Sequence, residues 1–94
     1  MTIRRANGYI KFHREDDEYI IDLVWVSVGA RNKGVATHLI KLVEKYVSQR
    51  ASCNTISFYA EPQDDTTDKK RLYNFYRNLG YQDNECEGLF CKVV

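Results

Sequence analysis

The feature of this sequence that most constrains its fold is a change in the spacing of apolar residues near Gly34. Before it, residues 19–28 (YIIDLVWVSV) are rich in β-branched and aromatic side chains, which is typical of a central strand. After it, apolar residues recur with the period of an amphipathic helix that ends near Arg50; they are Ala36, Leu39, Ile40, Val43 and Val47. The stretch VSVGARNKGVATHLI, residues 26–40, therefore predicts a strand that leads directly into a helix.

The rest of the chain predicts further strands and a second helix. The strands are expected at residues 2–6, 8–14, 55–60, 81–86 and 89–93. The helix places Leu72, Phe75, Tyr76 and Leu79 on one face and ends at Gly80. The order β-β-β-α-β-α-β-β predicts an α+β fold with one mixed sheet and two flanking helices. Its unit at 19–60 is expected to be parallel and right-handed, and its outer hairpins antiparallel.

Composition excludes several classes of protein. The 94 residues allow one domain, and 44% apolar with 29% charged residues is ordinary for a globular chain. A net charge of +1 disfavours duplex binding as the main function, so we expect no direct nucleic-acid partner. No apolar run reaches the ~20 residues of a membrane span, and no leader segment is visible. Three cysteines without a C-x-x-C pair indicate neither disulfides nor zinc, and favour the cytoplasm.

Residues 31–37 (RNKGVAT) form a candidate phosphate site where the strand passes into the helix. The first backbone N–H groups of a helix lack internal partners and attract anionic oxygen. Gly34 lets a phosphate approach the backbone closely, Arg31 and Lys33 add positive charge, and Thr37 adds a hydroxyl. The alternative is a loop glycine flanked by solvated cations. The Walker and dinucleotide-binding patterns are both missing.

The pattern Arg31-x-x-Gly34-x-Ala36 resembles the Q/R-x-x-G-x-G/A motif of the GNAT superfamily of acetyl-CoA-dependent N-acetyltransferases. Residues 55–60 (TISFYA) resemble the family's next strand, from which the central strand splays apart. RLYNFYRNLGY resembles the end of its last helix, with Tyr76 and Gly80 at matching spacing. The resemblance implies an acetyltransferase that binds acetyl-CoA. The cofactor-binding residues that it implies are Val24, Val26, Val28, Arg31, Asn32, Lys33, Gly34, Val35, Ala36 and Thr37.

Two departures and one narrower resemblance qualify this picture. The chain starts almost at the family's second strand, so a strand and two helices of the acceptor site are missing. Lys69 stands near the place of a common asparagine, and Val28 where proline is frequent. GYI, IIDLVWV, FYAEPQDD and the short length resemble the compact phage-encoded anti-CRISPR acetyltransferases. These enzymes acetylate a lysine with which a Cas12a effector reads the DNA motif beside its target, which implies a protein lysine as acceptor.

The reaction needs a base, because a lysine amine with a pKa of ~10.4 is mostly protonated at neutral pH. Asp22, expected on the same strand face as Val24, is one candidate, and Glu61 at the end of the next strand is another. The alternative for Asp22 is a solvated groove or an ion pair with Arg71. The alternative for Glu61 is an exposed loop.

The family resemblance implies that Tyr76 protonates the leaving thiolate and that the Val26 N–H stabilises the oxyanion. The alternative for Tyr76 is plain core packing, and Tyr73 is the second candidate for the acid.

Two other classes of function stay open at the level of sequence. One is a catalytically silent CoA-binding module that acts by docking on a partner protein, and the other is an interaction domain without a cofactor. An open-edged sheet could also pair with a second copy as a homodimer.

Overall fold

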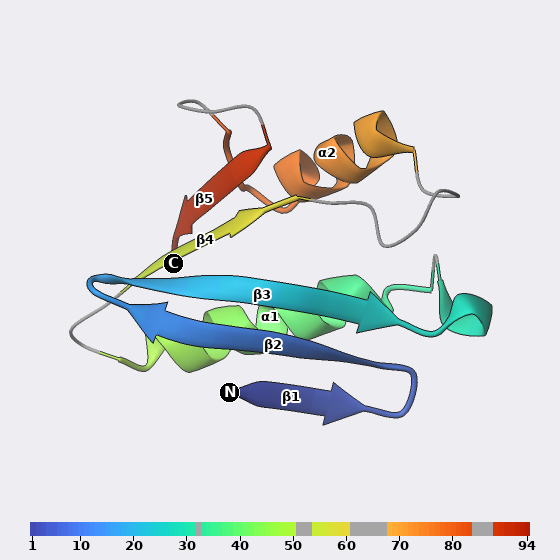
Figure 1. The fold of residues 1–94 in the computed structure, drawn as a ribbon, viewed down its shortest axis with the longest axis horizontal. Coiled ribbons are helices and arrows are strands. Elements are labelled where there is room, and N and C mark those ends of the chain that lie inside the picture. Colours follow the sequence, from blue (N-terminus) through green and yellow to red (C-terminus); the bar gives the residue numbers. More distant parts are fainter. Residues whose placement is uncertain (32, 51–53, 61–67, 84–87) are drawn as a thin grey trace.

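The chain folds as a five-stranded sheet with both helices packed on one of its faces (Figure 1). The computed structural model describes residues 1–31, 33–50, 54–60, 68–83 and 88–94. The strands, which lie in sequence order across the sheet, are β1 (Thr2–Arg5), β2 (Gly8–Glu15), β3 (Glu18–Val26), β4 (Thr55–Tyr59) and β5 (Leu89–Val93). The helices are α1 (Val35–Ser48) and α2 (Lys69–Asn78), with a short 3-10 turn, η1, at Val28–Ala30. No helix in these described ranges is long and apolar enough to span a bilayer.

Strand pairing confirms the predicted mixed sheet. β3 and β4 pair in parallel, whereas β1–β2, β2–β3 and β4–β5 pair antiparallel. The strand predicted at 19–28 ends earlier, at Val26, because the Ser27 carbonyl accepts the N–H of Ala30 and the chain turns. The strand predicted at 81–86 is wrong over its described part, where only Gln82 bridges to Cys91. Residues 84–86 lie outside the described ranges.

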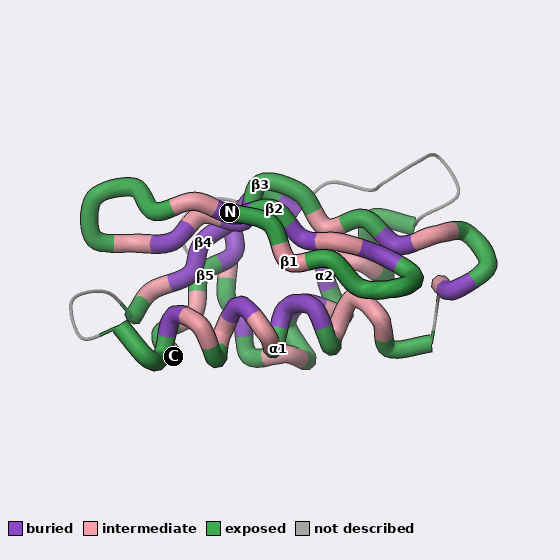
Figure 2. Tube along the Cα trace, turned by 90° about the horizontal axis from the view of Figure 1, so that it is seen from below, coloured by how far each residue is buried: buried purple, intermediate pink, exposed green. Residues whose placement is uncertain are grey.

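The two helices pack over different parts of the sheet. Leu39, Ile40, Val43 and Val47 of α1 are buried against β2, β3 and β4, as their spacing predicts. Figure 2 shows α1 as a separate layer beneath the strands. α2 instead packs on β4 and β5 through rings: the centroids of Tyr73 and Tyr76 lie 5.4 and 5.6 Å from that of Phe90. Tyr73 is therefore buried, whereas Leu72, Phe75 and Leu79 of the predicted face are half-buried.

The end of α2 is tied to α1 by a small polar network. The Tyr81 hydroxyl donates to Glu44 over 2.8 Å, and Lys92 Nζ donates to the same Oε2 atom over 3.2 Å. Lys92 also donates to the Leu79 carbonyl over 2.8 Å. Burial, followed by the Glu44 hydrogen bond, raises the pKa of Tyr81. Gly80, at φ 96°, ends the helix as predicted.

β3 separates from β4 along most of its length. Only Glu18, Tyr19 and Ile20 pair with β4, at Thr55, Ile56 and Ser57. Beyond Ile20, β3 continues to Val26 beside β2 alone. Figure 1 shows β3 and β4 diverging from this point. This confirms the predicted splayed sheet, and it leaves the end of β3 facing the gap towards α2.

A β-bulge in β3 decides which of its side chains face the helices. Lys11 pairs with Leu23 and Phe12 with Ile21, which leaves Asp22 as the extra residue. Since side chains alternate along a strand, the extra residue shifts the helix-facing series to even numbers, and Val24 and Val26 turn towards the helices. The prediction that Asp22 shares the face of Val24 is wrong for this reason.

Candidate active site

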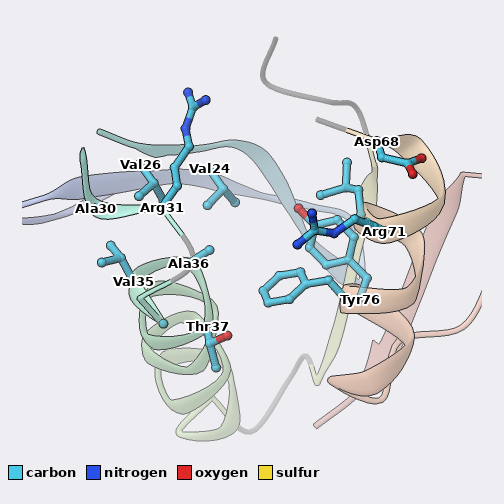
Figure 3. Close-up of a pocket in the computed structure, with 13 residues that line it drawn as sticks. Val24, Val26, Ala30, Arg31, Val35, Ala36, Thr37, Asp68, Arg71 and Tyr76 are labelled. Atoms are coloured by element: carbon cyan, nitrogen blue, oxygen red, sulfur yellow. The ribbon is translucent and has the colours of Figure 1, made fainter. Parts of the chain in front are cut away.

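A cavity of about 500 Å³ lies between the start of α1, the end of β3 and the first turns of α2 (Figure 3). Its lining residues are Val24, Val26, Ala30, Arg31, Gly34, Val35, Ala36, Thr37, Asp68, Arg71, Leu72, Phe75 and Tyr76. The cavity exists because β3 leaves β4 after Ile20, so that no strand fills the space between β3 and α2. Its floor is apolar, and its polar groups come from the two helix starts and their flanking side chains.

The start of α1 provides an anion-binding geometry. Gly34 is the N-cap residue at φ 80°, and no side chain caps the helix. The first helical hydrogen bond runs from the His38 N–H to the Gly34 carbonyl, so the N–H groups of residues 35–37 have no partner within the helix. A Cβ on Gly34 would meet no atom within 4 Å, which means that the approach to these groups is open. The residues present therefore fit the phosphates of a nucleotide cofactor.

The structure brings most of the predicted cofactor residues to this cavity. Those that line it are Val24, Val26, Arg31, Gly34, Val35, Ala36 and Thr37. Val28 does not line it, because the turn at η1 leaves this side chain 76% exposed. Lys33 is exposed and also outside the lining. Asn32 lies outside the described residues.

Sequence reasoning missed the α2 wall apart from Tyr76. Arg71, Leu72 and Phe75 line the cavity with it, and Asp68 begins the helix by accepting the Lys70 N–H over 2.9 Å. Leu72 precedes Tyr76 by four residues, and Arg71 precedes Phe75 by four, so each pair lies on one helix face. Helical spacing from Tyr76 could therefore have identified Leu72, whereas Arg71 and Phe75 are brought to the cavity by the packing of α2.

Tyr76 extends from α2 towards β3, with its ring held among other aromatic rings (Figure 3). Its centroid lies 4.6 Å from that of Phe58 and 5.2 Å from that of Phe75. Burial raises the pKa of Tyr76 to about 12. None of the described residues makes a hydrogen bond with the Tyr76 hydroxyl. No buried polar side-chain atom among the described residues lacks a hydrogen-bond partner. The Tyr76 oxygen is therefore not fully buried, and it is reached from the cavity.

Tyr73, the second candidate for the acid, points elsewhere. It is 7% exposed and does not line the cavity. Its hydroxyl oxygen lies beside Gly88, where a Cβ added to that glycine would be only 2.8 Å away. Of the two tyrosines, only Tyr76 is therefore placed to act in the cavity.

The two predicted bases are not brought to the cavity in the described part of the chain. Asp22 does not line it, and its carboxylate lies 2.8 Å from Nδ1 of His13 rather than beside Arg71. Glu61 lies outside the described residues. No group of three or more possible metal-ligating side chains occurs among the residues that are described.

His13 is expected to make the stability of the fold depend on pH. Hydrogen bonds to Asp22 first, and to Glu15 second, raise the pKa of His13 above its usual 6.5. The protonated form therefore stabilises the folded state below about pH 6.5, and this contribution is lost as pH rises through the raised pKa. We expect His13→Gln to lower the free energy of unfolding more at about pH 5.5 than at about pH 8.5 in urea titrations. An equal loss at both pH values would contradict this assignment.

Comparison with known proteins agrees with the cavity geometry. The sequence profile of the Acetyltransferase (GNAT) family matches residues 5–81. The crystal structure of the anti-CRISPR protein AcrVA5 is similar, with 32% sequence identity, a TM-score of 0.84, and coverage of 98% of this chain and 96% of that one. No curated protein sequence matches significantly.

Two more distant structures share the fold. One is the PaiA N-acetyltransferase of Thermoplasma acidophilum in complex with coenzyme A, at 13% identity and a TM-score of 0.72. The other is NAA60 of Arabidopsis thaliana in complex with a bisubstrate analogue, at 16% identity and a TM-score of 0.73. They match 94% and 93% of this chain, which spans only 54% and 64% of theirs.

Proposed function

Because the chain belongs to the GNAT family and is an acetyl-CoA-dependent acetyltransferase, we propose that its acceptor is a lysine side chain of a protein. The most specific form of this proposal is that the acceptor is a lysine of a Cas12a effector. The similarity to anti-CRISPR AcrVA5 over nearly the whole of both chains carries this proposal. A catalytically silent module is disfavoured, because both the phosphate site and Tyr76 are present in one cavity.

The start of α1 would hold the diphosphate of the cofactor, and β3 its pantetheine arm. Residues 35–37, whose N–H groups have no partner within the helix, line the cavity, and Arg31 adds positive charge beside them. Val24 lies on the part of β3 that β4 does not cover, where an extended amide chain can pair with a strand edge. When bound, the cofactor supplies an acetyl group as a thioester with a thiol leaving group.

Tyr76 is the proposed general acid. A hydroxyl with a pKa of about 12 keeps its proton at neutral pH, so it can donate that proton to the departing sulfur. The ring contacts with Phe58 and Phe75 hold it in position. The backbone N–H of Val26 is the proposed donor to the oxyanion.

The proton of the acceptor amine needs a separate route. Glu61, which follows β4 in the sequence, stays a candidate base from sequence reasoning. Asp22 faces away from the cavity side of β3, so it serves only an acceptor that approaches from the other sheet face. An intervening water is the third route.

The sheet face opposite the helices favours a large acceptor. Leu23, Trp25 and Tyr59 lie on this face beside the split between β3 and β4, and they are 40%, 37% and 67% exposed. In the described part of the chain no helix covers them, so a protein surface can approach the split directly. The described residues form no small enclosed acceptor pocket on this face.

The proposal is tested by incubating the protein with acetyl-CoA and a purified Cas12a effector and mapping modified lysines by mass spectrometry. We expect acetylation of a lysine that contacts the DNA motif beside the target, and none with Tyr76→Phe over the same time. An unmodified effector would remove the Cas12a proposal. Release of CoA with lysine-containing peptides would then test for another protein acceptor.

The cofactor site is tested by Ala36→Glu. A carboxylate in the first turn of α1 stabilises the helix by about 0.3–1 kcal/mol, but here it occupies the cavity wall and repels a phosphate. We expect CoA affinity in calorimetry to fall more than about tenfold without a loss of thermal stability. His38→Glu is the matched control, since His38 is exposed and outside the cavity. Equal affinities of the two variants would place the phosphates elsewhere.

Two coarser properties also stay proposals. We expect the enzyme to act in the cytoplasm and to be able to pair as a homodimer through a sheet edge. Light scattering across a concentration series tests the second, and a constant monomer mass would reject it.

A further inference from the structure

Arg71 is a cationic side chain in the cavity that forms no ion pair with any of the described residues. It lies in the first turn of α2 and lines the cavity on the wall opposite the start of α1. None of the described residues forms an ion pair or hydrogen bond with its guanidinium. Figure 3 shows this group extending from α2 into the space between the helices. An arginine without a partner in a cavity that binds an anionic carrier is a candidate ligand contact.

The charges around Arg71 favour an anion on this wall. The first turn of α2 carries Lys69 and Lys70 beside it and no acidic residue. Asp68 is the one carboxylate among the described lining residues, and its Oδ1 already accepts the Lys70 N–H over 2.9 Å. On the facing wall, the Arg31 side chain is positively charged and the N–H groups at the start of α1 carry partial positive charge. Positive groups therefore lie on both sides of the cavity.

We propose that Arg71 binds a phosphate group of CoA, so that the cofactor is held by α2 as well as by α1. This inference rests on the proposed cofactor site and adds a specificity-determining residue to it. The β3 wall of the cavity and the β4 strand beneath α2 are paired only at Glu18–Ile20 with Thr55–Ser57. A cofactor bound to both walls bridges this junction.

The guanidinium suits a phosphate better than an ammonium group would, because its planar donors can contact two oxygens at once. CoA offers two such partners, the diphosphate and the 3′-phosphate. Dephospho-CoA lacks only the 3′-phosphate, so it distinguishes them without altering the rest of the ligand.

The test measures the affinity of CoA and dephospho-CoA by calorimetry for the wild type, Arg71→Gln and Lys70→Gln. We expect Arg71→Gln to weaken CoA binding about tenfold, and Lys70→Gln, an exposed cation of the same turn outside the cavity lining, to change it less than about twofold. Arg71→Lys should restore part of the affinity. Equal dephospho-CoA affinity of wild type and Arg71→Gln assigns the 3′-phosphate, whereas a retained tenfold difference assigns the diphosphate.

The outcomes separate this inference from the proposed function. Wild-type CoA affinity in Arg71→Gln, or an equal loss in Lys70→Gln, would overturn the role of Arg71 while leaving the cofactor site intact. A wild type that does not bind CoA would overturn the proposed cofactor site itself. In steady-state assays Arg71→Gln should raise KM for acetyl-CoA about tenfold with kcat nearly unchanged, because the contact is made equally before and during reaction. Circular dichroism checks that this exposed substitution leaves the fold unchanged.

Discussion

Tyr76→Phe is expected to lower kcat about a hundredfold or more while KM for acetyl-CoA stays nearly constant. The substitution removes only the hydroxyl, which none of the described residues hydrogen-bonds, and keeps the ring that packs on Phe58 and Phe90. The fold and the cofactor site should therefore persist, and only the proton donor is lost. The result is checked by measuring the steady-state rate of CoA release from acetyl-CoA in the presence of the acceptor, together with the amount of acetylated acceptor formed.

Tyr73→Phe is the matched control, because Tyr73 lies on the same helix, is similarly buried and does not line the cavity. It should keep kcat within about twofold. If Tyr76→Phe retained the full rate, the acid would be another group or water. Because the pKa of Tyr76 is raised to about 12, the wild-type rate should also rise with pH as the acceptor amine deprotonates, with no fall due to Tyr76 below about pH 10.

Phe90→Ala is expected to lower the free energy of unfolding by about 3–5 kcal/mol, a large part of the roughly 5–15 kcal/mol of a small domain. Phe90 is fully buried on β5, and its ring lies 5.9 Å from that of Phe58 and 5.4 Å from that of Tyr73. Truncation leaves a cavity beneath α2 that these large rings fill only in part. Urea denaturation followed by circular dichroism measures the loss.

Val93→Ala provides the control on the same strand, since Val93 is 69% exposed. Its effect should remain within about 0.5 kcal/mol. A similar loss in both variants would mean that β5 is sensitive along its length rather than through the aromatic contacts of α2. Because Phe90 also supports Tyr76, with centroids 5.6 Å apart, the variant should lose activity even where it remains folded.

The local elements were predictable because periodicity is a property of neighbouring residues. The helix through Leu39, Ile40, Val43 and Val47 and the strands on either side of it follow from spacing alone. The strand expected at 81–86 failed over its described part because a short segment of sequence does not say how far a partner strand will pair with it, and here only Gln82 bridges to Cys91. The junction at Gly34 was predictable for the same local reason, as a glycine followed by a helical period.

The candidate site was predictable only on the α1 side. The phosphate site is contiguous in the chain, so its chemistry is visible in seven consecutive letters. The opposite wall, with Arg71 and Phe75, meets it only when α2 packs on β4 and β5, which no local pattern specifies. Tyr76 was found through the family resemblance rather than through its own surroundings.

The sequence by itself determined most of the segments that become strands and helices, and that a helix start suited to an anion follows β3. Only the tertiary structure decided which side chains those segments present to each other. One extra residue at Asp22 reverses the facing of β3, and the loss of pairing after Ile20 opens the space that α2 then borders. Both are consequences of strand register, which depends on contacts between distant residues and not on the spacing within either strand.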